Sequence, residues 1–367
     1  MNIDIQSLEL VNFRNYYQKQ LEDFSEINVF FGENGAGKTN LLEALSLVTN
    51  LESFRSAQNR DLLRKECGEA RIRASRNFLY TEGEIDLSIS DTKKQVKING
   101  KNKTKKDLLS HAGSLSFTPD DLLLIKQGSN KKRDSLDSLA CRVSSAFRQL
   151  KRDFDEMLRY KNTYLKEQSN SLMLDVINES FIRLAAQYIA KRLSLIRYIN
   201  QRIQEVYYEI SHEEYPLYLD YCFSWDRGGV VMSLEERLSL SLDEVQELLV
   251  NNIARYKSQE QQRLYALIGP QADKIVVSFK NQDAKQFASQ GQQRALVLAY
   301  KLTQLHFLKE IQGLNPILFL DDVYSELDSK KRQCLSNFIR GKYQTFITCT
   351  EFDQSLYLEY PQVYKIG

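Results

Sequence analysis

The segment from Gly32 to Thr39 has the residue types and the spacing of a phosphate-binding loop. Its sequence, GENGAGKT, fits the pattern G-x-x-x-x-G-K-[ST], follows an apolar run that ends at Phe31 and precedes a stretch typical of a helix, Asn40 to Val48. Glycines let the backbone wrap around a phosphate chain, so that the loop amides and the helix N-terminus point at the anion. The residues predicted to bind ATP here are Gly32, Glu33, Asn34, Gly35, Ala36, Gly37, Lys38, Thr39 and Asn40.

Four polar side chains have distinct expected roles in that chemistry. Lys38 should contact the β- and γ-phosphates, and the Thr39 hydroxyl should bind Mg²⁺. Two carboxylates, Asp321 and Asp322, follow the apolar run Ile317 to Leu320, which is typical of a Walker B strand. We expect Asp321 to bind the same Mg²⁺ and Asp322 to polarise the attacking water. The predicted catalytic residues are therefore Asp322 and Lys38, and the predicted metal ligands are Thr39 and Asp321.

Two further motifs lie on either side of this apolar run. The sequence from Ser289 to Gln293, SQGQQ, resembles the signature motif of ABC-type ATPases, and Ser325 to Asp328 resembles their D-loop. In that superfamily the signature motif of one subunit caps the γ-phosphate held by the P-loop of another. The resemblance implies that Ser289, Gly291, Gln292 and Asp328 belong to the nucleotide site of an ATP-induced homodimer. An ordinary N-cap serine is the alternative interpretation of Ser289.

The spacing of the motifs predicts how the chain is divided. Lys38 and Asp321 are separated by most of the 367 residues, so both ends of the chain must meet in one ATPase head. The fold class we predict is α/β, an ABC-type P-loop ATPase head built from both chain ends with a mainly helical inserted second domain. The predicted limits are residues 1–120 and 262–367 for the head and 121–261 for the helical domain.

The middle of the chain reads as helices and the first 120 residues read mostly as strands. Residues 129–215 contain neither glycine nor proline, and apolar side chains from Leu184 to Ile210 recur at helical steps, which predicts one long helix. This part could form a helical bundle or a short coiled-coil arm. Ser241 and Glu244 have capping-box spacing before another helix, expected to run to about Ile268. In the strand-rich part, Asn99 and Gly100 predict a hairpin turn.

Segments spread over nearly the whole chain resemble the RecF family of bacterial recombination-mediator ATPases. They are Leu10–Tyr16, Ser53–Ser56, Phe117–Leu122, Lys131–Asp137, Ser289–Arg294, Asp321–Asp328 and Phe346–Thr350. By this resemblance Arg14 and Thr350 also belong to the nucleotide site. The resemblance implies DNA as a partner, as duplex or at a single/double-strand junction, with RecR and RecO-like mediators and, indirectly, RecA. It implies a role in DNA repair, replication, recombination and the SOS response.

Two departures from the family pattern bear on activity. Residues Gly269 to Asp273 read GPQAD where the family usually has GPHRD, so Gln271 and Ala272 replace a basic pair. Gln290 stands where the signature motif often has arginine. ATP binding is still expected. We expect slow, DNA-stimulated hydrolysis that acts as a binding switch, because a switch for gripping DNA need not turn over quickly.

Two other functions are compatible with the ATPase motifs. One is an ABC-type subunit of a transport system, against which the wide motif spacing and the helical insertion argue. The other is an ATPase of a defence or chromosome-organising system, which the GPQAD departure leaves open.

Any DNA-binding surface must be local, because the formal net charge is only +2. The densest basic cluster surrounds the Asn99-Gly100 turn and comprises Lys93, Lys94, Lys97, Lys101, Lys103, Lys105 and Lys106. Lysines on a hairpin can neutralise DNA phosphates without reading sequence, although a merely solvated loop would have the same composition. Lys131, Lys132 and Arg133 are the next candidates. His111, His212 and His306 have no metal-ligand spacing and are predicted to be structural.

Composition excludes several other classes of protein. The five cysteines are scattered and lack C-x-x-C spacing, which favours reduced thiols in the cytosol over disulfides or zinc ligation. The N-terminus has no signal-peptide pattern, and no apolar run approaches the roughly 18 residues that a membrane span needs. We therefore predict a cytoplasmic protein with no membrane association.

Overall fold

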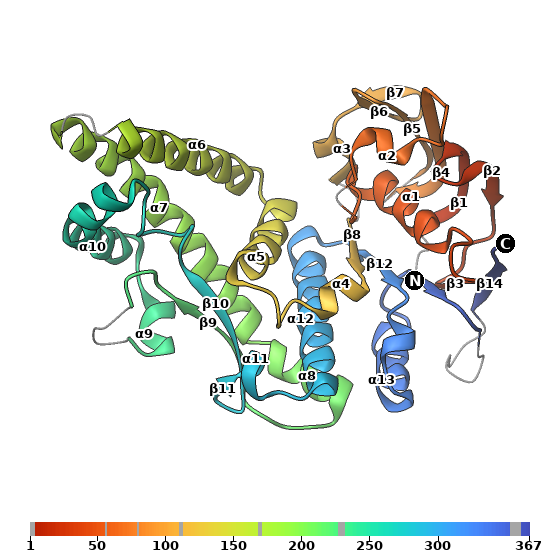
Figure 1. Cartoon of the computed structure of the whole chain (residues 1–367). Coiled ribbons are helices and arrows are strands. Elements are labelled where there is room, and N and C mark those ends of the chain that lie inside the picture. Colours follow the sequence, from red (N-terminus) through yellow and green to blue (C-terminus); the bar gives the residue numbers. More distant parts are fainter. Residues whose placement is uncertain are drawn as a thin grey trace. The chain divides into compact units, whose positions relative to one another are not determined.

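A computed structural model describes residues 4–55, 57–78, 81–109, 113–167, 171–226, 232–352 and 361–367. Ser56, His111 and the side chain of Lys106, named above, lie outside this description. The chain forms two compact units (Figure 1): Met1–Leu122 with Tyr207–His212 and Arg294–Gly367, and Leu123–Val206 with Glu213–Gln293. The predicted limits at residues 120 and 262 stay a prediction, because compact units and functional domains need not end at the same residues.

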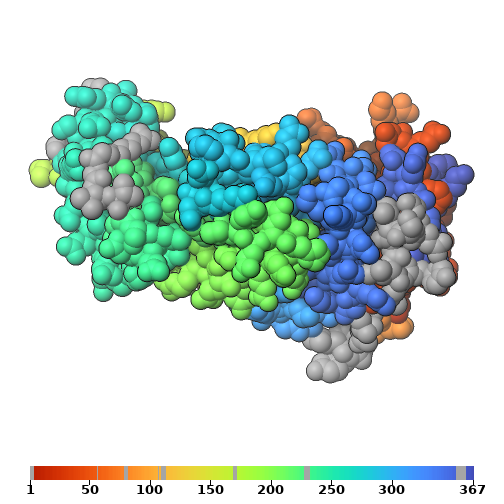
Figure 2. All heavy atoms as spheres, turned by 90° about the horizontal axis from the view of Figure 1, so that it is seen from below, coloured from red at the N-terminus to blue at the C-terminus, as the bar shows by residue number. Residues whose placement is uncertain are grey.

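The first unit contains a parallel sheet of five strands in the order β14-β3-β13-β12-β8. Its strands are β3 (Ile27–Phe31), β8 (Ser114–Phe117), β12 (Ile317–Asp321), β13 (Thr345–Cys349) and β14 (Gln362–Lys365). Strands β12 and β13 are buried along their whole length, as expected for apolar runs without alternation. The two ends of the chain therefore share one sheet, and their red and blue atoms also lie together in the surface view (Figure 2). This confirms the predicted α/β head.

Helices of the first unit carry or support the motifs. They are α1 (Lys38–Asn50), α2 (Asn59–Leu62), α3 (Lys105–Leu109), α4 (Pro119–Leu122) and α13 (Ser329–Ile339), with most of α12 (Gln290–Gln312) and the 3₁₀ turn η1 (Tyr324–Glu326). Helix α1 packs against β12 and β13. Lys301 of α12 forms an ion pair of 2.7 Å with Asp121 of α4. The pair ties the helix that follows the signature motif to the end of β8.

A second, antiparallel sheet in this unit has six strands in the order β2-β1-β4-β5-β6-β7. Its strands are β1 (Ile5–Phe13), β2 (Tyr16–Leu21), β4 (Glu69–Phe78), β5 (Thr81–Ser90), β6 (Lys94–Ile98) and β7 (Lys101–Lys103). Alternate residues such as Ile85, Leu87 and Ile89 are fully buried against the core. Asn99 and Gly100 have φ of 50° and 76°, the left-handed conformations of a two-residue hairpin turn, which confirms that prediction.

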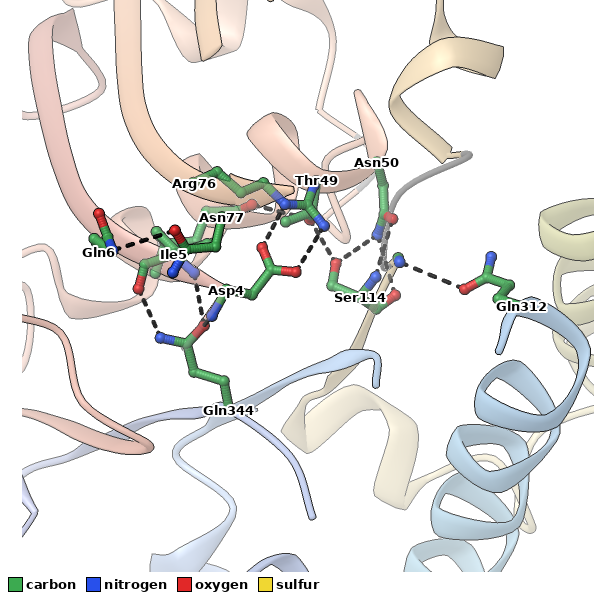
Figure 3. Close-up of polar contacts among 12 residues, drawn as sticks. Asp4, Ile5, Gln6, Thr49, Asn50, Arg76, Asn77, Ser114, Gln312 and Gln344 are labelled. Atoms are coloured by element: carbon green, nitrogen blue, oxygen red, sulfur yellow. Dashed lines mark hydrogen bonds and ion pairs between the residues drawn. The ribbon is translucent and has the colours of Figure 1, made fainter. Parts of the chain in front are cut away.

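Buried polar side chains join the two sheets of the first unit (Figure 3). The side-chain amide of Gln344 accepts from the Ile5 backbone N–H at 2.8 Å and donates to the Ile5 carbonyl at 2.7 Å, as a neighbouring strand would. Asp4 forms an ion pair with the fully buried guanidinium of Arg76. Near the end of α1, Asn50 donates to the carbonyl of Ser114 at 3.1 Å. These contacts hold the antiparallel sheet against β13 and hold α1 against β8.

The second unit is mainly helical. Its elements are α5 (Ser129–Val143), α6 (Ser145–Glu167), α7 (Ser171–Asn200), α8 (Ile203–Ser211), β9 (Leu217–Cys222), α9 (Leu234–Ser239), α10 (Leu242–Arg263), β10 (Lys274–Phe279), β11 (Gln282–Asp283) and α11 (Ala284–Phe287). The last residues of α8 belong to the first unit. Helices α6, α7 and α10 pack on one another, and β9, β10 and β11 form a small antiparallel sheet.

Two helix predictions need correction. The single helix expected through Ile210 is wrong, because α7 ends at Asn200 and α8 begins at Ile203. The Asn200 side chain accepts from the Leu219 N–H at 2.7 Å and donates to its carbonyl at 2.9 Å, so it pairs with β9 where the helix ends. Helix α10 ends at Arg263 rather than near Ile268. Its predicted capping box between Ser241 and Glu244 is confirmed.

A buried ion pair links α5 to α7 in the second unit. Arg192 donates two hydrogen bonds of 2.8 Å to Asp137, and both side chains are 4% exposed. The same guanidinium donates to the carbonyl of Pro270 at 2.6 Å. Arg192 therefore joins Asp137 of α5 to the segment Gly269–Asp273, which has the sequence GPQAD.

We expect Asp137→Ala to lower the free energy of unfolding by about 3–5 kcal/mol, because it leaves the Arg192 guanidinium buried without its counter-charge. Chemical denaturation of the parent and the variant measures the change. Asp134→Ala is a matched control, since Asp134 is exposed on the same helix, and it should shift stability by no more than about 0.5 kcal/mol. Similar small effects of both changes would show that the ion pair contributes little.

Candidate nucleotide-binding site

The loop between β3 and α1 has a conformation that requires glycine. Gly35 and Gly37 have φ of 85° and 107°, in the region that L side chains rarely adopt. A Cβ on Gly37 would lie 2.5 Å from the Asn15 side-chain nitrogen and 2.6 Å from the Tyr16 hydroxyl. A Cβ on Gly32 would lie 2.1 Å from the Ile366 carbonyl. The glycines of the motif therefore allow both the turn and the close packing around it.

Lys38 lies inside this loop. Its ammonium donates to the carbonyls of Gly32 and Glu33, at 2.7 and 2.8 Å, and the residue is 8% exposed. A lysine held this way at the start of α1 places a positive charge beside the loop amides and the helix N-terminus, both of which favour anions.

The register of the parallel sheet brings Thr39, Asp321 and Thr348 together. Asp321 and Thr348 are directly paired at the ends of β12 and β13. One oxygen of the Asp321 carboxylate accepts from the Thr39 hydroxyl at 2.8 Å and from the Thr348 hydroxyl at 2.9 Å. Burial raises the pKa of Asp321, and these two hydrogen bonds and the positive charge of Arg55 act in the opposite direction.

Asp322 has a strained backbone that the surrounding residues hold. Its φ is 52°, and its N–H donates to the Thr348 hydroxyl at 2.9 Å. The Ser325 hydroxyl donates to the Asp322 carbonyl at 2.6 Å and to its carboxylate at 3.1 Å. Thr348 therefore fixes both carboxylate residues of the Walker B strand.

Side chains of the β1–β2 turn and of α1 support the phosphate-binding loop from outside. Arg14 makes two hydrogen bonds of 2.8 Å to the fully buried Glu43, which also accepts from Ser53. Asn15 donates to the carbonyl of Ala36 at 3.2 Å and accepts from Asn40 at 2.8 Å. Arg14, predicted to bind nucleotide, is thus engaged with a carboxylate of the first helix.

The D-loop residue Asp328 caps α13. Its carboxylate accepts from the Lys331 backbone N–H at 2.9 Å and forms an ion pair with the same lysine at 2.6 Å. Arg294 of α12 binds the neighbouring Glu326 through its carbonyl at 2.8 Å and its carboxylate at 2.5 Å. The D-loop is therefore held to α12 within one subunit.

The signature residues belong to the second unit, and the first three of them are exposed. Ser289 caps α12: its hydroxyl accepts from the Gln292 N–H at 3.3 Å, and the Gln292 side chain accepts from the Ser289 N–H at 3.0 Å. Ser289, Gln290 and Gly291 are all open to solvent. Ser289 therefore caps its own helix, which is compatible with both interpretations of this residue, and it lies open to solvent at the helix N-terminus.

Sequence reasoning missed the residues that orient the predicted ligands. Thr348 contacts Asp321, and Glu43 contacts Arg14. Thr348 lies in the family-like segment Phe346–Thr350 but was given no role there, and Glu43 lies in none of the family-like segments. The predicted Thr350 follows β13 as an exposed residue. The apolar run at residues 345–349, TFITC, was the available signal, because a polar residue near the end of a central strand points to the same sheet edge as the Walker B carboxylates.

The two candidate basic clusters differ in exposure. Lys132 is buried, and Arg133 donates to the carbonyl of Asp273. In the hairpin cluster Lys105 forms an ion pair with Glu52, whereas four lysines are exposed: Lys93, Lys97, Lys101 and Lys103. The hairpin therefore presents the larger free positive charge.

None of the helices that the structure describes is long and apolar enough to cross a membrane. The five cysteines all fall within the described ranges, and none of them is in a disulfide.

A P-loop and a Walker B strand at one edge of a parallel sheet define an ABC-type P-loop ATPase head. Residues 4–366 match the RecF/RecN/SMC N-terminal domain family, and the chain belongs to that family. It is similar to the DNA replication and repair protein RecF of Halothermothrix orenii, at 31% identity over 362 residues, 95% of this chain and 92% of the relative. RecF of Staphylococcus epidermidis is 30% identical over 355 residues, 95% and 94% of the two chains.

The fold is similar to that of a solved RecF structure. The structure of the recombination mediator RecF with ATP in the RecFOR pathway has a TM-score of 0.82 at 27% identity, covering 99% of this chain and 96% of that one. An Smc head bound to the C-winged helix domain of ScpA has a TM-score of 0.54 at 14% identity, covering 95% of this chain and 90% of that one, and supports the fold alone.

We expect Thr348→Val to weaken Mg²⁺-dependent nucleotide binding about tenfold, because it removes a buried hydrogen bond to Asp321, the predicted metal ligand. Affinity for a fluorescent ATP analogue, measured with Mg²⁺ and with EDTA, separates the metal from the nucleotide. Thr348→Ser, which keeps the hydroxyl, should restore most of the affinity. An equal loss with and without Mg²⁺ would contradict a role through Asp321.

Proposed function

We propose that this protein is an ATP-dependent DNA-binding protein of recombinational repair and replication-fork maintenance. The observation that carries the proposal is the Thr39–Asp321 hydrogen bond beside Lys38, because it places a hydroxyl and a carboxylate where a P-loop protein binds Mg²⁺. Membership of the family that includes RecF, and the similarity to a RecF structure named for its ATP, support the nucleotide.

The residues of this site have separable roles in the proposed reaction. Bound Mg²⁺-ATP supplies the phosphoanhydride bond that is hydrolysed. Lys38 and the loop amides hold its phosphates, and Thr39 and Asp321 hold the metal. Asp322, whose backbone is fixed by Thr348, orients and polarises the water. The positions of these side chains at one edge of the sheet support this division.

Hydrolysis and dimerisation are coupled in this proposal. The signature residues Ser289, Gly291 and Gln292 of one subunit cap the γ-phosphate held by the partner, with Asp328 beside them. The solvent exposure of Ser289 and Gly291 at the N-terminus of α12 supports this arrangement. The dimer grips DNA in the ATP state and releases it after slow hydrolysis. RecR and RecO-like mediators then assist the loading of RecA.

Family membership favours this function over the alternatives. The match covers nearly the whole length of relatives that are named as DNA replication and repair proteins. This supports DNA as the partner over a transport substrate. A defence or chromosome-organising role would use the same ATP-dependent dimer with other partners. DNA binding by the isolated protein would favour the repair role. A stable complex with a nuclease would favour the defence or chromosome-organising role.

We expect ATP to convert the monomer to a dimer and Ser289→Arg to prevent this. The arginine adds bulk and charge at the proposed interface but leaves the P-loop intact, so ATP affinity should change less than about threefold. Sedimentation with and without ATP measures the dimer, and Lys38→Ala is the control that loses ATP binding itself. A Ser289→Arg protein that dimerises on ATP like the parent would refute the two-site sandwich.

Asp322→Asn should bind ATP normally, hydrolyse it at least about tenfold more slowly and stay dimeric for longer, because only the water-polarising carboxylate is changed. Single-turnover hydrolysis and sedimentation on the same sample measure both effects. Normal turnover in this variant would assign the role to another residue.

The exposed hairpin lysines are the proposed DNA contact. Lys97, Lys101 and Lys103 lie on β6 and β7 around a tight turn, and their side chains are free to meet phosphates. Contacts of this kind depend on salt and ignore base sequence.

Changing Lys97, Lys101 and Lys103 together to Ser should weaken duplex binding and reduce the slope of log affinity against log salt by about 0.9 for each phosphate that the variant no longer neutralises. The control changes three other exposed lysines, Lys126, Lys166 and Lys191, and so has the same net charge. A salt titration of DNA binding compares the two. Equal slopes in both variants would remove the hairpin from the DNA site.

A further inference from the structure

The side chain of Tyr16 carries a buried hydroxyl with an unusual position. Tyr16 is the first residue of β2 and pairs with Phe13 across the tight β1–β2 turn. Its ring packs against the core of the first unit. The hydroxyl oxygen is buried and has no hydrogen-bond partner among the described residues. A buried donor without an acceptor is costly, so its retention needs a reason.

The hydroxyl is directed at the phosphate-binding loop. It would lie 2.6 Å from a Cβ placed on Gly37, the residue before Lys38. The neighbouring Asn15 is hydrogen-bonded to the Ala36 carbonyl and to Asn40, which holds this turn against the loop. Tyr16 therefore reaches the loop from a fixed position.

The chemistry of this group suits a donor to an anion. Burial raises the pKa of Tyr16 to about 12, so the hydroxyl keeps its proton at any pH near neutrality. A neutral phenol in a low-dielectric position can donate to an oxyanion but cannot repel it. Tyr17, the next residue of the strand, is 68% exposed and has the Arg64 guanidinium over its ring instead.

We propose that the Tyr16 hydroxyl donates a hydrogen bond to the phosphate chain of the nucleotide held by the P-loop. The inference rests on the proposed ATP binding and adds a binding residue outside the recognised motifs. A phosphate oxygen is the favoured acceptor, because Gly37 belongs to the part of the loop whose amides form the phosphate cradle.

The change Tyr16→Phe separates a role in binding from a role in packing. A binding role predicts weaker ATP affinity without loss of stability, whereas a packing role predicts loss of stability. Removing an unpaired buried hydroxyl should leave the melting temperature of the nucleotide-free protein unchanged or raise it. The dissociation constant for ATP should rise about tenfold, because the variant cannot donate this hydrogen bond to a charged group. Thermal melting without nucleotide and calorimetric titration with ATP measure the two effects on the same preparation.

Tyr17→Phe is the matched control and should change neither quantity. A Tyr16→Phe protein that loses melting temperature and affinity together would show a structural tyrosine, and unchanged affinity would show no contact; either result overturns the proposal. A tenfold loss with ATP that disappears with 2′-deoxy-ATP would assign the contact to the ribose and overturn the phosphate assignment. If the parent and Lys38→Ala both fail to bind ATP, the proposed function itself is wrong, which is distinguishable from a defect confined to Tyr16→Phe.

Discussion

The carboxylate of Asp321 is the point on which the geometry of the site depends. One of its oxygens accepts hydroxyl donors from Thr39 and Thr348, which belong to the first and the last parts of the chain. The two hydrogen bonds offset part of the desolvation that disfavours the ionised form, although the pKa of Asp321 remains raised. A change in the register of β12 against β13 would separate these groups, because every pairing in a sheet moves together. The register of these two strands is therefore a condition for the proposed metal site.

The rest of the first unit holds that register. The buried amide of Gln344, just before β13, pairs with the backbone of Ile5, so the antiparallel sheet restrains the start of that strand. Glu43 plays a comparable role on α1, where it holds Arg14 of the β1–β2 turn. The strained φ of Asp322 is maintained by the Thr348 and Ser325 hydroxyls. Backbone strain of this kind persists only when neighbouring groups restrict the alternative conformations.

Local sequence signals predicted local structure well. The P-loop, the hairpin at Asn99-Gly100 and the capping box at Ser241 each depend on residues a few positions apart, and the structure has all three. Contacts between distant segments were not predictable in the same way. Thr348 matters because β13 pairs with β12, and no spacing along the chain encodes that pairing.

Contacts between segments distant in sequence also explain the wrong predictions for the second unit. The helix break after Asn200 has no glycine or proline to announce it, since it depends on the pairing of that side chain with Leu219 in β9. Arg133 reads as part of a basic cluster, yet its guanidinium donates to the carbonyl of Asp273, far away in sequence. Charge in a sequence indicates what a side chain can do, whereas its availability depends on tertiary contacts.

The departure at GPQAD can be judged from the contacts that anchor this segment. Asp273 is buried and accepts from the Tyr221 hydroxyl at 2.6 Å and the Ser224 N–H at 2.7 Å, and Arg192 binds the Pro270 carbonyl. Gln271, one of the two departing residues, donates to the Ile268 carbonyl at 3.0 Å, and its own side-chain oxygen is buried with no partner in the described part of the chain. The anchors are therefore residues that follow the family pattern. The loss of two basic residues therefore changes the charge of the segment, while the contacts of Pro270 and Asp273 are kept.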